Sequence, residues 1–540
     1  MCKNLHAVRR VTAGLAMGLA LQGNATAQPP VVQAEEGVGQ AIAHRLTGAT
    51  GPGSGAQSIR IFYEGRGFRP LWLEAPKRNE LIAAVDDSRA DGLEPTDYGL
   101  ARLRELAVQD ERNAESLAAR DLAFTEALAR LVRHLSHGKV DPASLYSIWN
   151  FSPPADPLEQ ALRLQRVADS GSLRAAIVAQ APQLDAYRTL KDSLAHHRAI
   201  EAAGGWGRIS AGPTMRRGER SARVAALRAR LAASADLEAA AHGAKGASVD
   251  HFDDALAAAV ARFQLRHGLA PDGTVGKDTL EALNVGVAER IAQLRVNLER
   301  LRWVASDVQP DVLMVDIAGF KAELRLANQP VWSTRVVVGR PSRETPSLLD
   351  SVQHVVLNPK WVVPPTILRE DVIPGMRRNP DYLSSHRLRL VDRSGKTVDP
   401  SEVDWHSQGG AFPYQVVQTS GADGSLGQIK FALGNRHSIY LHDTPSRSLF
   451  QRPARAYSSG CVRVENPQEL ALLLLDDPQQ WSADTLKSAI GSGKTRTVRV
   501  NREIPVMLLY YTAAADGSGA VSFRKDIYQR DPRVLAALSS

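Results

Sequence analysis

The spacing of hydrophobic residues changes along this chain and divides it into a helical part and a strand-rich part. From about residue 57 to residue 200, alanine- and leucine-rich segments alternate with proline and glycine stops such as Asp91-Gly92 and Pro95. Segments of this kind are typical of helices separated by short turns. We therefore assign residues 28–203 to a helical scaffold domain.

A second, smaller helical unit is predicted at residues 204–287. Hydrophobic residues recur there every three or four positions, at Val224, Leu227 and Leu231 and again at Leu256, Val260 and Phe263. Such stripes are buried faces of helices rather than cofactor sites. Gly268 is positioned to end the second helix, and a short third helix follows at residues 279–283.

Strand patterns begin at about residue 311 and continue through most of the remaining chain. Runs rich in Val, Leu and Ile, bounded by turns, predict strands at 312–319, 322–326, 334–339, 354–364, 429–433 and 437–442. Strands that follow one another with few intervening helices indicate an antiparallel sandwich or barrel. The fold class is therefore α+β and multidomain, with a β-rich domain at 288–540.

Residues 367–428 interrupt the strand series and are more polar and richer in glycine. A flexible linker and a folded insertion are both compatible with this composition. Aromatic residues, namely Trp405, Phe412 and Tyr414, favour the folded insertion, because a linker has no core in which to bury them.

The first 27 residues have the pattern of a secretory signal peptide. Lys3, Arg9 and Arg10 precede an apolar run at 11–21, and Ala25-Thr26-Ala27 provides a small-x-small cleavage site. The apolar run is too short for a permanent membrane anchor. We expect an exported protein with no transmembrane segment after signal cleavage.

Export changes the interpretation of charge and cysteine content. Removal of residues 1–27, which carry three positive and no negative charges, lowers the net charge from +8 to +5. A modestly basic protein suits an anionic polymer, although solubility explains the charge equally well. Cys2 leaves with the signal, so Cys461 remains as a single thiol in an oxidising compartment, where it is either buried or used.

The residues around Cys461 favour a reactive thiol over a buried structural one. Ser458-Ser459-Gly460 is a small-residue approach that can direct backbone N–H groups at a developing oxyanion, and Gly460 allows the backbone to bend. The alternation after it places Cys461 and Arg463 on one face of a strand and two valines in the core. Asn466 and Pro467 then start a buried helix.

His442 ends the preceding strand and shares a face with Tyr440, whereas His437, five positions earlier, is expected on the opposite face. His442 can accept the thiol proton and later deprotonate an incoming amine. Arg463 could favour the thiolate or hold a substrate carboxylate, and the alternative is a surface salt bridge. Asp443 would point away on a strand, so a backbone carbonyl is an equally good candidate to orient His442.

No metal site is predicted. His134 and His137 could share a helix face, but no third ligand lies near them in the sequence, and we expect them at the surface. A thiolate mechanism requires no metal and no cofactor.

These segments resemble known families. Residues 259–284 (AVARFQLRHGL, PDGTVG, TLEALN) resemble a three-helix peptidoglycan-binding domain. HDTPSRSLF and RAYSSGCVRV resemble the His and S-x-G-C-x-R signatures of L,D-transpeptidases with the YkuD-type catalytic fold. GGWGRI, RVNLERLRW, VVVGRPSRETP, NPKWVVPPTI, FYEGRGFRPLW and DGLEPTDY further resemble the large multidomain Gram-negative branch.

The resemblance implies specific roles and partners. Cys461 becomes the nucleophile and His442 the base, with Ser459, Gly460, Arg463 and Tyr440 around them. The implied substrate is the peptidoglycan tetrapeptide stem, joined into 3→3 cross-links in the periplasm, with residues 367–428 as a lid and carbapenems as inhibitors. Neither a cofactor nor a nucleic-acid partner is implied.

Two alternatives remain open. The same thiolate could serve an L,D-carboxypeptidase or a cysteine endopeptidase, in which water replaces the acceptor amine. The chain could instead be a non-catalytic wall-binding protein, with an inert Cys461 and a function carried by residues 205–285.

Overall fold

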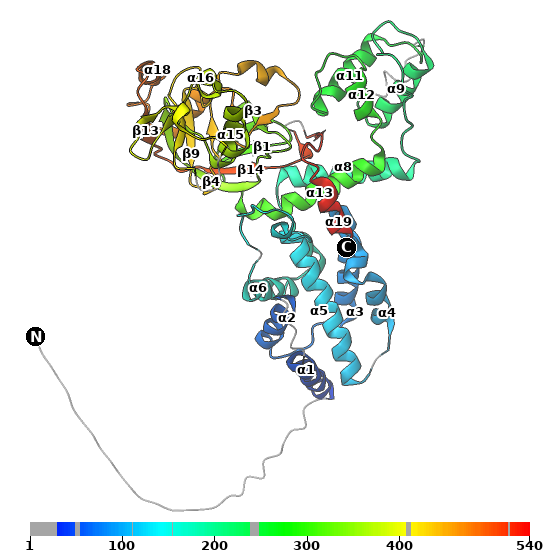
Figure 1. The fold of residues 1–540 in the computed structure, drawn as a ribbon. Coiled ribbons are helices and arrows are strands. Elements are labelled where there is room, and N and C mark those ends of the chain that lie inside the picture. The colour runs from blue at the N-terminus through cyan, green and yellow to red at the C-terminus, as the bar shows by residue number, and fades with distance from the viewer. Residues whose placement is uncertain are drawn as a thin grey trace, which may run out of the picture.

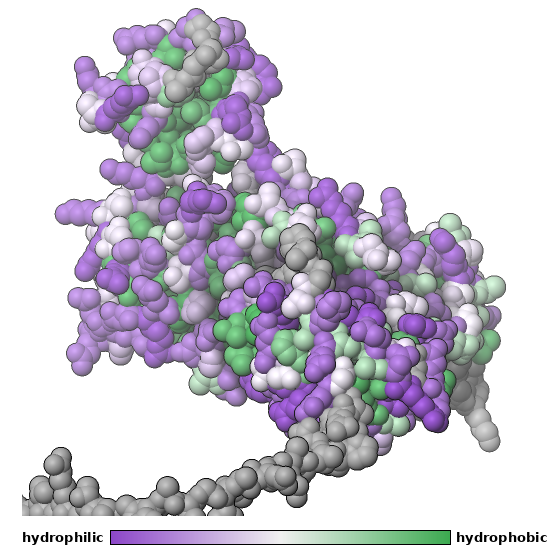
Figure 2. Space-filling view, turned by 90° about the horizontal axis from the view of Figure 1, so that it is seen from below, coloured by the Kyte–Doolittle hydropathy of each residue, from purple (hydrophilic) through white to green (hydrophobic). Residues whose placement is uncertain are grey.

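The computed structural model describes residues 30–48, 54–110, 112–153, 155–237, 248–406, 412–516 and 519–540. The predicted signal peptide lies outside these residues. Within them, no helix is both long enough and apolar enough to cross a membrane. Figure 2 shows hydrophilic side chains over most of one face, with hydrophobic side chains in small patches between them.

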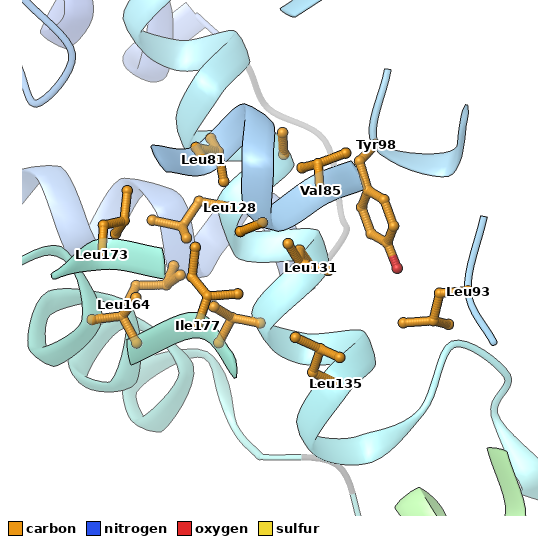
Figure 3. Close-up of a cluster of buried hydrophobic side chains, with 14 of the residues drawn as sticks. Leu81, Val85, Leu93, Tyr98, Leu128, Leu131, Leu135, Leu164, Leu173 and Ile177 are labelled. Carbon is orange, nitrogen blue, oxygen red and sulfur yellow. The ribbon is translucent and has the colours of Figure 1, made fainter. Parts of the chain in front are cut away.

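The N-terminal half is a helical scaffold, as predicted. Its helices are α1 (Pro30–Gly48), α2 (Ser54–Gly65), α3 (Ala75–Asp87), α4 (Leu100–Val108), α5 (Ala114–His137), α6 (Pro157–Ala168), α7 (Leu173–Val178) and α8 (Asp185–Ala202). Leucine and isoleucine side chains from α3, α5, α6 and α7 converge in one core (Figure 3). Truncating a buried leucine such as Leu128 to alanine costs about 2–5 kcal/mol.

His134 is buried in this scaffold, so its predicted surface position is wrong. Its Nδ1 lies 3.1 Å from the Tyr98 hydroxyl, and only 3% of the residue is exposed. Burial, together with the positive charge of Arg133, lowers the pKa of His134 to about 2. The residue is a neutral core histidine.

The small helical unit contains α9 (Ala222–Ala233), α11 (Asp254–Arg266) and α12 (Lys277–Leu283). The side chains of Ser221 and Asp253 cap the first two helices by accepting from backbone N–H groups three residues later. The predicted stripe residues form its core. Gly268, with a φ of +67°, follows the end of α11 as predicted.

The β-rich part is a closed barrel. Its strands are β1 (Val312–Asp316), β2 (Lys321–Leu326), β3 (Gln329–Gly339), β4 (Leu348–Leu357), β9 (Ile429–Leu433), β10 (Leu441–His442), β12 (Val462–Val464) and β14 (Pro505–Leu509). They pair in the order β3-β12-β10-β9-β4-β14-β1-β2, and β2 pairs back to β3. Two further strands pair with the ring: β11 (Ala456–Ser458) pairs with β3, and β13 (Arg496–Arg499) pairs with β4. Pairing is mostly antiparallel, but β10–β12, β1–β14 and β11–β3 are parallel.

Two helices, α17 (Pro467–Leu475) and α18 (Ala483–Gly491), pack on the barrel. Pro467 occupies the first turn of α17 as predicted. Asn466 stands at the N-cap position, but its side chain makes no capping hydrogen bond.

The polar segment after β4 is a folded insertion, as the sequence indicated. It contains a sheet of β5 (Trp361–Val362), β8 (Gln415–Gln418), β6 (Leu388–Val391) and β7 (Thr397–Val398). Short helices α14 (Pro365–Ile367), η5 (Leu368–Val372), α15 (Ile373–Arg378) and α16 (Tyr382–Ser385) accompany it. Trp405, Val416 and Leu390 are among the residues of its own hydrophobic core.

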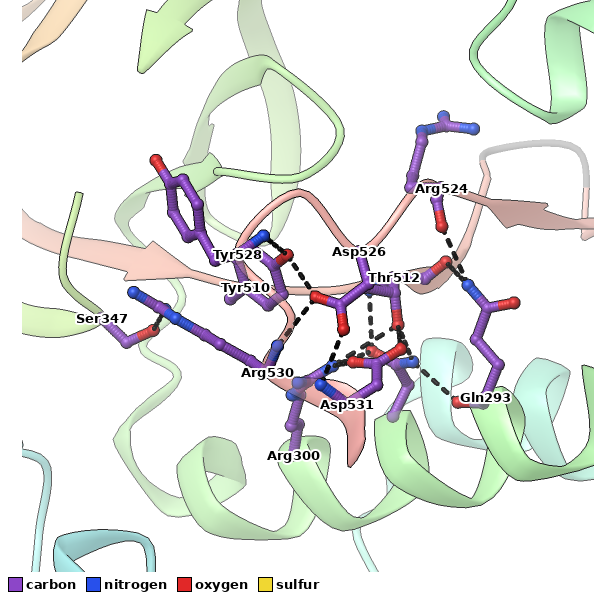
Figure 4. Close-up of polar contacts among 11 residues, drawn as sticks. Gln293, Arg300, Ser347, Tyr510, Thr512, Arg524, Asp526, Tyr528, Arg530 and Asp531 are labelled. Carbon is purple, nitrogen blue, oxygen red and sulfur yellow. Dashed lines mark hydrogen bonds and ion pairs between the residues drawn. The ribbon is translucent and has the colours of Figure 1, made fainter. Parts of the chain in front are cut away.

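The C-terminal segment connects the barrel to the scaffold. After β14 the chain forms β15 (Ala513–Ala515), β16 (Val521–Phe523) and α19 (Asp531–Ser539), which lie against α13 (Val287–Val304) beside α8 (Figure 1). Arg300 of α13 binds Asp531 at 2.6 Å, and Tyr510 donates to Asp526 at 2.6 Å (Figure 4). Arg530 continues this network to Glu344, at 2.6 Å, in the loop after β3.

Candidate active site

A cavity of about 830 Å³ lies where the barrel meets the folded insertion. All six residues predicted for the site line it: Cys461, His442, Tyr440, Ser459, Gly460 and Arg463. From the insertion, Trp361, Asp371 and Tyr382 also line the cavity. The structure therefore brings the predicted residues together in one substrate-sized space.

Cys461 lies in the short connection between β11 and β12. Gly460 before it has a φ of +113°, a conformation that L side chains rarely adopt. Val462 and Val464 after it are fully buried, whereas Cys461 and Arg463 are partly exposed. The predicted alternation is confirmed, and it directs the thiol and the guanidinium to the cavity side of the barrel.

The connection is fixed by hydrogen bonds on both sides of the thiol. The Ser458 hydroxyl donates to the carbonyl of Cys461 at 2.5 Å and accepts from the Gly460 amide at 3.1 Å. The Thr345 hydroxyl donates to the Gly460 carbonyl at 2.8 Å. Tyr528, from the C-terminal segment, accepts from the Thr345 amide at 3.2 Å. The Gly460 amide thus already donates a hydrogen bond within the loop. An oxyanion role for Ser459 and Gly460 remains a prediction.

His442 is buried at the end of β10 and is held in one tautomer. Its Nδ1 donates to the backbone carbonyl of Asp443 at 2.5 Å, which leaves Nε2 as the basic nitrogen. Burial and the nearby positive charge of Arg463 lower its pKa to about 3, so the imidazole is neutral near pH 7. A neutral imidazole can accept the proton of a thiol.

The carboxylate of Asp443 turns away from His442, as the sequence indicated. One oxygen accepts from the Gln428 amide at 2.8 Å, and the other pairs with Arg447 at 2.5 Å. Of the two candidates considered for orienting His442, the backbone carbonyl makes the contact.

The expected position of His437 is wrong. The segment before β10 is not a continuous strand, because Ser438 has a φ of +57° and the strand comprises only Leu441 and His442. This bend returns His437 to the cavity wall, where it is exposed. Both histidines therefore line the cavity, and they differ in burial: His442 is buried, whereas His437 is exposed.

Tyr440 contacts both the thiol and the imidazole. Its ring centroid is 5.6 Å from that of His442, in an edge-to-face arrangement. Burial raises the pKa of the Cys461 thiol, while the Tyr440 backbone amide and hydroxyl and the charges of Lys430 and Arg463 oppose this rise. Groups other than an imidazolium therefore offset part of the cost of ionising this buried thiol.

Arg463 is in position to meet an anion from the cavity. Its Nε is buried without a hydrogen-bond partner, and no ion pair of Arg463 occurs among the described residues. Burial lowers the pKa of the guanidinium. The alternative of a surface salt bridge does not match this environment.

Two basic residues of the site were missed by sequence reasoning. Lys430 lies in the strand predicted at 429–433, next to His442 on the neighbouring strand. Arg343 lies in the loop after β3 and binds both the Ser459 hydroxyl, at 3.2 Å, and the carboxylate of Asp371 in the insertion. Sequence reasoning missed both because each reaches the site through strand pairing or loop contacts between segments that are distant in the chain.

No group of three or more His, Cys, Asp or Glu side chains that could hold a metal ion occurs in the described parts of the chain. The chemistry available from the site residues themselves is a thiol, a neutral imidazole and a cluster of cations.

Comparison with known proteins agrees with this geometry. Residues 310–493 match a family described as "L,D-transpeptidase catalytic domain", residues 220–283 match a "Putative peptidoglycan binding domain", and residues 57–194 match a "Scaffold domain". A protein of Haemophilus influenzae named "Putative L,D-transpeptidase" is 37% identical over 248 residues. The aligned part covers 45% of this chain and 49% of the relative, so the match spans about half the length of each.

Proposed function

Because this chain carries an L,D-transpeptidase catalytic domain of the YkuD family and a peptidoglycan-binding domain, we propose that it forms 3→3 cross-links between peptidoglycan stems. The observation that carries the proposal is the shared cavity of Cys461 and a neutral His442 fixed by the Asp443 carbonyl. That arrangement places a nucleophile and a base in one cavity, and a third group sets the orientation of the base.

The proposed reaction has two halves. His442 Nε2 accepts the proton of Cys461 as the sulfur attacks the carbonyl at the L-centre of diaminopimelate. The terminal D-Ala leaves with that proton on its amine, and a thioester remains on Cys461. The side-chain amine of a second stem, deprotonated by His442, then displaces the sulfur, and the thiol regains its proton.

Arg463 is proposed to bind a carboxylate of the donor stem. Stem peptides carry carboxylates at diaminopimelate and at the terminal D-Ala, and a buried guanidinium nitrogen without a protein partner favours such an anion. Tyr440 would border the bound peptide, and the insertion would cover it as a lid. These assignments follow from the residues that line the cavity.

Domains that act on peptidoglycan indicate an extracytoplasmic protein. We propose the periplasm as the compartment, with residues 1–27 as the leader that directs export. The domain limits predicted from the sequence, 28–203, 204–287 and 288–540, are retained as part of this proposal.

The test is incubation of the protein lacking residues 1–27 with purified tetrapeptide muropeptides, followed by mass spectrometry. Dimers with a 3→3 linkage are expected in the wild-type protein and absent from Cys461→Ala. Accumulation of tripeptide alone would favour the L,D-carboxypeptidase, and cleavage of existing cross-links the endopeptidase. No reaction by a folded protein would favour a wall-binding role.

A further inference from the structure

A row of three basic side chains crosses three neighbouring strands of the barrel, and two of them, His442 and Arg463, line the cavity. His442 of β10 lies directly opposite Lys430 of β9 and directly opposite Arg463 of β12. Residues paired in this way share one face of a sheet, and in an antiparallel pair such as His442 and Lys430 the Cβ atoms lie about 5 Å apart. The next row along the strands, Phe431, Leu441 and Val462, is fully buried on the other face.

Tyr440 links Lys430 to the thiol, because it contacts both. The Lys430 ammonium lies over the Tyr440 ring, 4.0 Å from the centroid, and the backbone of Tyr440 accepts from the Val462 amide at 3.1 Å next to Cys461. Lys430 is partly buried, and across from it on β4 is the apolar Val356. No carboxylate pairs with it among the described residues.

We propose that Lys430 supplies a second positive charge, besides Arg463, that favours the Cys461 thiolate. This inference rests on the proposed function, in which Cys461 is the nucleophile. An ammonium without a carboxylate partner finds its nearest counter-charge in the thiolate, and a cation near a thiol stabilises its ionised form. The charged and titratable groups that act on the thiol are Lys430 from β9, Tyr440 from the segment before β10, and Arg463 from β12, and His442 of β10 lines the same cavity.

The same row has a consequence for proton transfer. When His442 takes the thiol proton, the imidazolium stands between two cations, which destabilise it. A protonated His442 is therefore a strong acid and readily passes its proton to the departing amine. Lys430 thus contributes to both ionisation of the sulfur and expulsion of the leaving group.

The test measures the rate of Cys461 alkylation by iodoacetamide against pH, using the protein without residues 1–27. In Lys430→Met the midpoint of the profile is expected to rise by about one pH unit, with about tenfold slower alkylation at pH 7. Lys430→Arg, which keeps the charge, should restore the wild-type midpoint. Lys487→Met, at an exposed position on α18, is the matched control and should leave it unchanged.

Lys430→Gln provides a second neutral variant, and circular dichroism shows whether each variant is folded. An unchanged midpoint in folded Lys430→Met or Lys430→Gln would overturn the inference, as would an equal rise in Lys430→Arg. Either result leaves the proposed function intact if wild-type protein still forms 3→3 dimers. Absence of dimers in wild-type protein would instead contradict the proposed function, whatever the alkylation profiles show.

Discussion

Arg343 binds Asp371 through two parallel hydrogen bonds, at 2.5 and 2.7 Å, and so joins the loop after β3 to the insertion across the cavity. The same guanidinium reaches Glu370 at 2.9 Å and the Ser459 hydroxyl at 3.2 Å. One nearly buried side chain thus contacts both the insertion and the loop that carries the thiol. Bidentate pairs of this kind add geometric precision as well as energy.

This relationship predicts that weakening the contacts between Arg343 and the insertion slows acylation of Cys461. Asp371→Asn combined with Glu370→Gln should increase hydrogen exchange of residues 365–385 and slow acylation of Cys461 by roughly 10- to 100-fold, the cost of slight misplacement of reacting groups. Glu402→Gln, at an exposed position of the same insertion, is the control. Unchanged acylation together with increased exchange would show that the insertion does not position the thiol.

The next prediction separates the two histidines of the cavity. His442→Ala should leave the protein folded and slow thioester formation by about 10²- to 10⁴-fold, the usual contribution of a general base. His437→Ala should have little effect, because His437 is exposed and none of the described residues orients its ring as the Asp443 carbonyl orients His442. The rates can be compared by stopped-flow fluorescence or by mass spectrometry of quenched samples. Equal losses would assign the base role to neither residue alone.

A third prediction concerns the pH dependence of acylation. The pKa of His442 is lowered to about 3, so its imidazole stays neutral as the pH falls from 7 to 4. A histidine with an ordinary pKa of about 6.5 would become protonated in that interval and produce an additional break. The logarithm of the acylation rate should therefore show no inflection near pH 6.5. A break there that disappears in His442→Gln would contradict the assignment of a neutral buried base.

Inhibition by β-lactams gives a fourth prediction. A strained β-lactam carbonyl is an acyl donor that a thiolate can open, leaving a thioester on the enzyme. A carbapenem should add one drug mass to the protein, on the peptide that contains Cys461. Cys461→Ser should lose the adduct, because a hydroxyl beside the same imidazole is a much poorer nucleophile near pH 7. An adduct on a serine of the wild-type protein would contradict the Cys461 assignment.

The local part of the site was predictable because its signals lie within a few residues of the thiol. Two valines that alternate with Cys461 and Arg463 were sufficient to predict which side chains face the cavity, and Gly460 marked the bend before them. The helical scaffold and the three-helix unit followed from hydrophobic spacing in the same way.

What could not be predicted depends on pairing between distant segments. Lys430 became part of the site through its register with His442, and no sequence pattern shows which strands become neighbours. His437 was misplaced because a positive φ at Ser438, a non-glycine residue, ends the strand alternation. His134 was expected at the surface because its partner Tyr98 lies on a different element, 36 residues away.

The position of β14 in the barrel bears on when this protein can become reactive. β14 lies between β4 and β1, so the ring of strands stays open until residues 505–509 are in place. Tyr528, which supports Thr345 below Gly460, lies still later in the chain. A chain synthesised from its N-terminus would therefore carry an unsupported thiol loop until residues 505–528 are available to fold. The loop that carries Cys461 is therefore fixed only when the C-terminal segment has joined the barrel.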